Sequence, residues 1–238
     1  MTLAGLFDVD SAGTDQQVRA EPIQRRSAER LSTLLDAAAE AVDAVGFDRI
    51  TTAMIAERAG ASIGTVYRYY PDRVAVLQAL HQRTVLRFRQ RIVEEFDVTP
   101  PSTWWDVVDC ALNAFIGLSR SEPGFRIMQF ADRERTTADR AADETSAEIS
   151  GRQTGFFATR LSAVLAARFG LPDEPELIFR VEIAVEMAKS LLVRAFLHDP
   201  LGDDRFIDEC RRVVHDYLAD FYGPAVAVPL AAVKFKAV

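Results

Sequence analysis

Residues 51–70, TTAMIAERAGASIGTVYRYY, combine residue types and spacings that suit binding to a nucleic acid. Ala56 is small enough to lie where one short helix crosses another, and Gly60 can adopt the positive φ that a tight turn needs. Val66, six residues after Gly60, is a branched apolar residue that can fill the space between the two helices. This spacing predicts a helix-turn-helix, with a plain helical hairpin as the alternative.

The second helix of this motif, expected from Ser62 to about Tyr70, has polar groups on its outer face. Ser62 can cap the helix and contact a phosphate, while Thr65, Tyr67 and Arg68 present hydrogen-bond donors and acceptors. Gly64 is a poor helix former, and a close approach of the helix backbone to a DNA groove explains a glycine there. Whether these side chains read bases or only hold phosphates is left open by the sequence.

The elements that position this motif are expected to be helical. Apolar residues recur at three- and four-residue steps from Ser27 to Val45, and Gly46 can end that helix. Thr51 or Thr52 can cap the next one, and Pro71 suits the start of a fourth that ends before Pro100. No strand pattern is found, so the fold is predicted to be all-α. Further helices are expected at Trp104–Ser119, Phe125–Asp132, Ala138–Phe169 (with an interruption near Gly151 and Gly155), Glu176–Leu197 and Phe206–Phe221.

Charge is distributed unevenly along the 238 residues. The net charge of −7 argues by itself against a nucleic-acid partner. From Phe47 to Ile92, however, eight arginines accompany three acidic residues, so this segment carries +5 and the rest of the chain carries −12. A basic segment in an acidic protein suits a DNA-binding head on a body with another role.

Several other functions find no support in the sequence. There is no GxSxG, no phosphate-binding glycine loop and no HExxH, so no catalytic residue is expected. Cys110 and Cys210 lie far apart and only three histidines exist, so we expect neither a metal site nor a cofactor, and we interpret both cysteines as buried apolar residues. No apolar run approaches the roughly 18 residues of a membrane span, and no secretory signal is visible. We therefore expect a cytoplasmic protein without a membrane partner.

The sequence AERAGASIGTVYRYYPDRVAVL, residues 56–77, together with the preceding GFDRITTAMI, resembles the TetR family of regulators. The resemblance covers about residues 30–80. It implies an N-terminal three-helix DNA-binding domain with a helix-turn-helix, followed by a larger helical domain for ligand binding and dimerisation. The family usually has a lysine where this chain has Arg73, which keeps the charge, and an acidic residue where it has Val74. The positions that match DNA-facing residues of the family are Thr52, Ser62, Gly64, Thr65, Tyr67, Arg68, Tyr70 and Arg73.

The resemblance also implies a small-molecule effector in the body and a homodimer on a palindromic double-stranded operator. The two last helices would form the dimer interface. Aromatic residues at helical spacing are usually core, but a subset can line a pocket, and the aromatic count suggests an apolar or aromatic effector. The candidate ligand-binding residues are Trp104, Phe115, Arg126, Met128, Phe130, Asp132, Phe157, Glu186 and Met187.

The expected organisation has four parts. A flexible arm spans residues 1–26 and ends in Arg25 and Arg26, which could reach phosphates or simply be solvated. The DNA-binding domain spans 27–72, the ligand-binding and dimerisation domain spans 73–223, and a tail spans 224–238. A repressor released by its effector is the expected function. An enzyme, a non-specific architectural DNA-binding protein and a regulator that responds to a protein partner are the alternatives.

Overall fold

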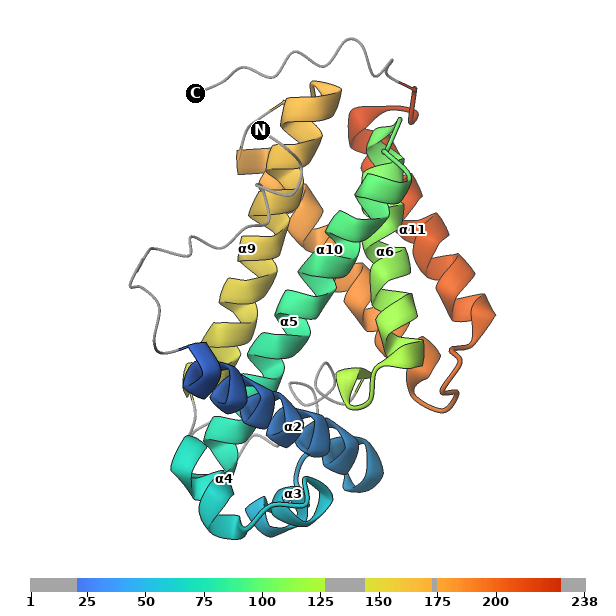
Figure 1. Ribbon diagram of the computed structural model, residues 1–238. Helices are drawn as coiled ribbons and strands as arrows, with labels where there is room; N and C mark the ends of the chain where they lie inside the picture. Colours follow the sequence, from blue (N-terminus) through green and yellow to red (C-terminus); the bar gives the residue numbers. More distant parts are fainter. Residues whose placement is uncertain (1–20, 127–143, 173–174, 228–238) are drawn as a thin grey trace. The chain divides into compact units, whose positions relative to one another are not determined.

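The computed structural model describes residues 21–126, 144–172 and 175–227 (Figure 1). Within these ranges the chain is entirely helical, as the sequence predicts. The described residues form two compact units. The first contains residues 21–87 and 122–126, and the second contains 88–121, 144–172 and 175–227. None of the helices described is long and apolar enough to cross a membrane.

The first unit is built from α2 (Glu21–Val45), α3 (Thr52–Arg58), α4 (Ile63–Tyr69) and the first turns of α5 (Arg73–Val98) (Figure 1). Helix α2 begins six residues before the expected Ser27. The sequence does not reveal this earlier start, because the first turns are polar and show no apolar stripe. Helix α5 begins after Pro71, and the carboxylate of Asp72 accepts a hydrogen bond from Ala75 N at 2.8 Å. The core of the unit is formed by Leu34, Val42, Ile50, Ile55, Val66, Val76 and Leu80.

This core explains why the compact unit extends beyond the expected boundary at residue 72. Val76, Leu77 and Leu80 of α5 are buried with the residues of α2, α3 and α4. The division between the two units therefore falls after Arg87, within α5.

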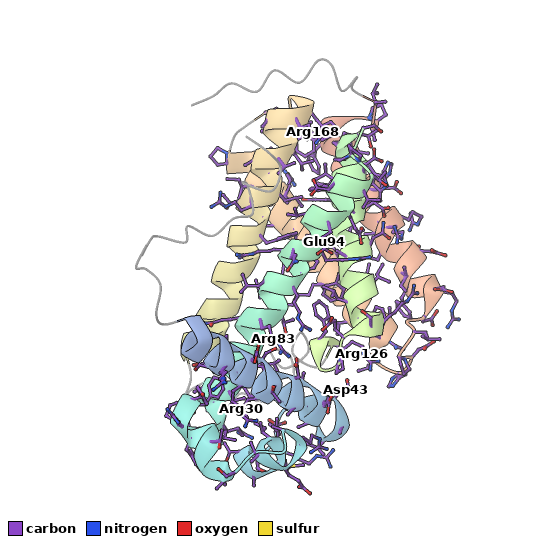
Figure 2. The ribbon with its side chains drawn as sticks, in the orientation of Figure 1. Arg30, Asp43, Arg83, Glu94, Arg126 and Arg168 are labelled. Carbon is purple, nitrogen blue, oxygen red and sulfur yellow. The ribbon has the colours of Figure 1, made fainter. Side chains whose placement is uncertain are left out.

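Residues 122–126 pack on α2 in the first unit. Gly124 N donates to Asp43 Oδ1 at 3.3 Å, and the Arg126 guanidinium lies 3.7 Å from the same carboxylate (Figure 2). Glu122 pairs with Arg87. Gly124 has a φ of +73°, and a β-carbon there would lie 2.9 Å from the carbonyl oxygen of Ala39. The short helix expected from Phe125 lies mostly outside the described residues.

The second unit contains the last turns of α5 with α6 (Trp104–Ser121), α9 (Glu144–Phe169), α10 (Pro175–Phe196) and α11 (Asp204–Tyr222). Helix α10 packs against both α9 and α11 (Figure 1). The expected interruption near Gly151 and Gly155 is wrong, because α9 continues through both glycines. Residues 21–26 of the expected arm belong to α2, and residues 1–20 of that arm and 228–238 of the expected tail lie outside the described residues.

The two cysteines differ in burial. Cys210 is fully buried, as expected, whereas Cys110 is half-buried, with its sulfur 3.6 Å from Glu95 Oε2. Burial raises the pKa of each thiol to about 12, and at Cys110 the negative charge of Glu95 adds to the effect. Both thiols are therefore protonated near neutral pH.

Candidate nucleic-acid interface

Two hydroxyl groups begin the helices of the helix-turn-helix. Thr51, one of the two expected caps, accepts a hydrogen bond from Met54 N at 3.2 Å. Ser62 accepts from Thr65 N at 3.2 Å, and its oxygen lies 2.9 Å from Thr65 Oγ1. Gly60 has the expected positive φ, +57°. The predicted motif is confirmed, and Val66 fixes α4 on the core with no exposed surface.

The outward face of α4 is composed of residues at helical spacing. Gly64 and Arg68 are exposed, and Tyr67 is 52 % exposed. Sequence reasoning missed Ile63, which is 48 % exposed on the same helix. No clear signal in the sequence marks this exposure, because Val66, a core residue, follows Ile63 at the three-residue core spacing. An exposed aliphatic group of this kind suits contact with a thymine methyl group.

Three of the expected DNA-facing residues do not lie on this outward face. Thr52 is buried, and its hydroxyl lies 3.2 Å from the hydroxyl of Tyr67. Arg73 is half-buried and donates to the carbonyl oxygen of Asp48 at 2.7 Å. Tyr70 is only 8 % exposed and belongs to the core, where burial raises the pKa of its phenol against an opposing effect of Arg83.

The displacement of Tyr70 has a local cause. It follows the last residue of α4 and has an extended backbone, with φ −133° and ψ 119°, so its ring does not continue the helical face. Ser62, Gly64, Thr65, Tyr67 and Arg68 are therefore brought together on α4, with Thr65 half-buried. Thr52 acts on this face through Tyr67, whose hydroxyl it holds.

The candidate ligand residues are not brought together as one set. Met128, Phe130 and Asp132 lie outside the described residues. Trp104 is buried beside Trp105 and His215, whereas Arg126 belongs to the first unit. Glu186 is exposed on α10 and Met187 is half-buried.

Two of the candidates do share a neighbour. The rings of Phe115 and Phe157 lie 6.2 and 5.4 Å from the ring of Phe88, between centroids. Sequence reasoning missed Phe88, which stands in the arginine-rich part of α5 and gave no separate signal. Phe115 and Phe157 are therefore the part of the predicted ligand set that the described residues bring together, and they meet at Phe88, which is half-buried like them.

Comparison with known families decides what kind of protein carries this site. Residues 34–80 match the family model of bacterial regulatory proteins of the tetR family. Residues 102–222, just over half of the chain, match the tetracyclin repressor-like C-terminal domain. The chain belongs to the TetR family. Members of this family are DNA-binding transcriptional regulators, and no catalytic family is indicated.

Relatives of known name match a smaller part of this TetR-family chain. The HTH-type transcriptional regulator BetI of Klebsiella pneumoniae is 31 % identical over 80 residues, which cover 34 % of this chain and 38 % of that protein. BetI of Escherichia coli is 30 % identical over 88 residues, covering 37 % of this chain and 43 % of the relative. The matching part thus spans about two fifths of the length of these relatives.

Similar solved structures are covered by this chain over nearly their whole length. A TetR-family transcriptional regulator from Streptomyces coelicolor has a TM-score of 0.63 and 29 % identity, over 80 % of this chain and 98 % of that one. A complex of SmeT with triclosan has a TM-score of 0.56 and 21 % identity, over 88 % and 99 %. Both support the all-helical fold with an N-terminal helix-turn-helix.

Proposed function

We propose that this TetR-family chain recognises a specific DNA sequence with α4 in the major groove. Gly64 is the observation that carries the proposal. A β-carbon at this position would meet only Ser62 Oγ, at 3.8 Å, which is ordinary van der Waals contact. The chain's own packing therefore gives no reason for a glycine that costs a helix about 1 kcal/mol relative to alanine. Close approach of the helix backbone to the walls of a DNA groove supplies the reason.

Tyr67 is the residue we propose to contact base edges. Its side chain is 52 % exposed, so it can reach into a groove. The hydroxyl of Thr52 lies 3.2 Å from its own, which fixes the direction of the phenol before DNA arrives. A held side chain loses less conformational entropy on binding than a free one, so it discriminates better between base pairs.

We further propose a homodimer on a palindromic operator, formed through α10 and α11. Several apolar residues of these two helices, Ala188, Leu192, Phe196 and Val214, are buried inside the protomer and are unavailable. The outward faces instead present Phe221, 44 % exposed, and Phe179, 51 % exposed. A two-fold dimer reads a two-fold site, which is the reason for expecting a palindrome.

Regulation would follow from a small apolar or aromatic effector that binds the body and releases the operator, so that the protein acts as a repressor. The half-buried rings of Phe88, Phe115 and Phe157 are the candidate contact surface. The effector must bind the DNA-incompetent state more tightly, because equal affinity for both states shifts nothing. A calorimetric screen of aromatic compounds tests this part, and absence of heat from every compound would contradict it.

The test of the proposed function is to select bound sites from random duplex DNA and to compare variants on the selected site. Tyr67→Ala should weaken binding to that site about tenfold or more, since a base contact contributes roughly 1–3 kcal/mol. Its affinity for random DNA should change little. Tyr67→Phe keeps the ring and shows how much the hydroxyl contributes. A non-specific architectural protein would instead yield no enriched site, or would lose affinity equally on both duplexes.

A further inference from the structure

The first unit has a hollow beside the outward face of α4. It is shallow and open to solvent, with a volume of about 740 Å³. The N-terminal turns of α2 and one side of α4 form its walls, and Figure 2 labels Arg30 on the α2 side. The lining residues are Arg26, Ser27, Glu29, Arg30, Thr33, Thr65, Arg68 and Tyr69.

Some arginines of the first unit are paired with carboxylates, whereas the arginines around the hollow have no such partner among the described residues. Arg83 lies 2.6 Å from Asp36, and Arg126 lies 3.7 Å from Asp43. Within the part of the chain that the structure describes, no carboxylate lies within ion-pair distance of Arg26, Arg30 or Arg68. The hollow thus gathers three guanidinium groups that have no carboxylate partner there, against one acidic lining residue, Glu29.

Hydroxyl groups stand between these arginines. Ser27 donates to the hydroxyl of Tyr69 at 3.5 Å, which joins α2 to α4 across the hollow. Thr33 and Thr65 add further hydroxyl groups to its lining. Arginine and hydroxyl side chains are the groups that proteins use to hold the phosphates of DNA, and guanidinium binds phosphate in a fork geometry.

We propose that the hollow binds the phosphate backbone of duplex DNA beside the groove that α4 enters. This proposal rests on the proposed function, because it takes α4 to be the helix in the groove. Arg26 and Arg30 lie on α2, outside the helix-turn-helix, so the DNA-contacting surface is larger than that motif. Arg68 then holds a phosphate rather than reading a base, while Tyr67 faces the bases. The hollow contributes affinity and orientation, and it carries no sequence information.

The experiment measures binding of the full chain to the selected duplex and to a random duplex of equal length, over a series of salt concentrations. The variants are Arg68→Ala and the double variant Arg26→Ala/Arg30→Ala. The slope of log K against log salt is negative. Each lost phosphate contact should make it less steep, by about 0.9 per bound subunit. Affinity should fall about tenfold for each lost contact, by the same factor on both duplexes, so that their ratio is kept.

Two control variants distinguish phosphate binding at the hollow from a general effect of net charge and from base reading by Arg68. Arg168→Ala removes one positive charge from α9 in the second unit and should leave the slope unchanged. Arg68→Lys keeps the charge, so it should keep most of the slope and the ratio of affinities. A base-reading arginine would lose the ratio in both Arg68 variants, since lysine cannot reproduce the two parallel hydrogen bonds of the guanidinium.

Two results would overturn the proposal for a wild type that prefers the selected duplex. One is an unchanged salt slope in the alanine variants, and the other is a loss of the ratio between the affinities for the selected and random duplexes. Failure of the proposed function looks different, since the wild type itself would then show no preferred sequence. Thermal unfolding of each variant shows that a loss of binding is not a loss of fold.

Discussion

The fold of this protein does not by itself require the residue types found at two positions of α4. A β-carbon at Gly64 would meet only the Ser62 hydroxyl, and Tyr67 is held by Thr52 although it is exposed. The glycine lowers the stability of the isolated protein, and both features become useful when a duplex lies against the helix.

Gly64→Ala tests this view directly. Alanine is the better helix former, and its methyl group meets only Ser62 Oγ at 3.8 Å, so stability should rise by up to about 1 kcal/mol. Operator binding, measured by fluorescence anisotropy, should weaken about tenfold, because the methyl group then stands between backbone and DNA. Gly117→Ala in α6 is the matched control, since a β-carbon there meets nothing within 4 Å. It should stabilise the protein without changing operator binding. Equal operator binding by both variants would contradict the role of Gly64.

The positions of the helix-turn-helix residues could be predicted from the sequence better than the direction in which each side chain points. Gly60, Val66 and the cap Ser62 could be predicted, because turn geometry and core spacing restrict the residue types. The burial of Tyr70 could not, because it depends on the extended backbone that follows α4. The partner of Arg73, a backbone carbonyl oxygen 25 residues away, gives no sequence signal at all.

Helices were predictable where an apolar period or a cap marks them. Helix α6 has a reciprocal cap that the sequence Ser-Thr-Trp-Trp-Asp contains. Thr103 Oγ1 accepts from Asp106 N at 3.1 Å, and Asp106 Oδ2 accepts from Thr103 N at 2.8 Å. The polar start of α2 and the continuity of α9 could not be predicted, because tertiary packing overrides weak local preferences.

Asp106→Ala should destabilise the protein by about 1 kcal/mol near neutral pH through loss of this cap. Burial raises the pKa of Asp106, but hydrogen bonds from Ser102 and Thr103 outweigh it and hold the pKa below its ordinary value of 3.8. The carboxylate therefore contributes stability above that value and loses it as the pH falls through its lower folded pKa. Denaturant unfolding should show a constant difference from wild type between about pH 7 and about pH 5, and a smaller one below about pH 4. A difference that changes between about pH 7 and about pH 5 would assign the effect to another group.

The segment after α6 depends on one close contact. Gly124→Ala adds a β-carbon 2.9 Å from a backbone oxygen at a φ of +73°. It should destabilise the first unit by about 1–3 kcal/mol, as measured by denaturant unfolding. Gly170→Ala is the matched control, with a φ of +66° and nothing within 4 Å, so it isolates the cost of the backbone conformation. A loss no larger than that of the control would show that residues 122–126 can leave α2 without cost.

At the scale of the whole molecule, charge and family membership point to the same division of roles. The arginine-rich segment from Phe47 to Ile92 carries +5 in a chain of net charge −7. The family models match the helix-turn-helix and the C-terminal domain separately. The all-helical class and the DNA-binding motif could be predicted from the sequence. The effector could not, because ligand pockets in helical bodies are formed by residues distant in sequence.

Sequence-specific binding is tested most directly by titrating the selected duplex and a random duplex of equal length at two salt concentrations. We predict that a palindromic site keeps an advantage of at least about 1,000-fold over random DNA at both concentrations, although both affinities fall with salt. Equal affinities that both vanish at moderate salt would contradict this prediction. The helix-turn-helix would then make only electrostatic contacts, and the body would have to carry the specific function.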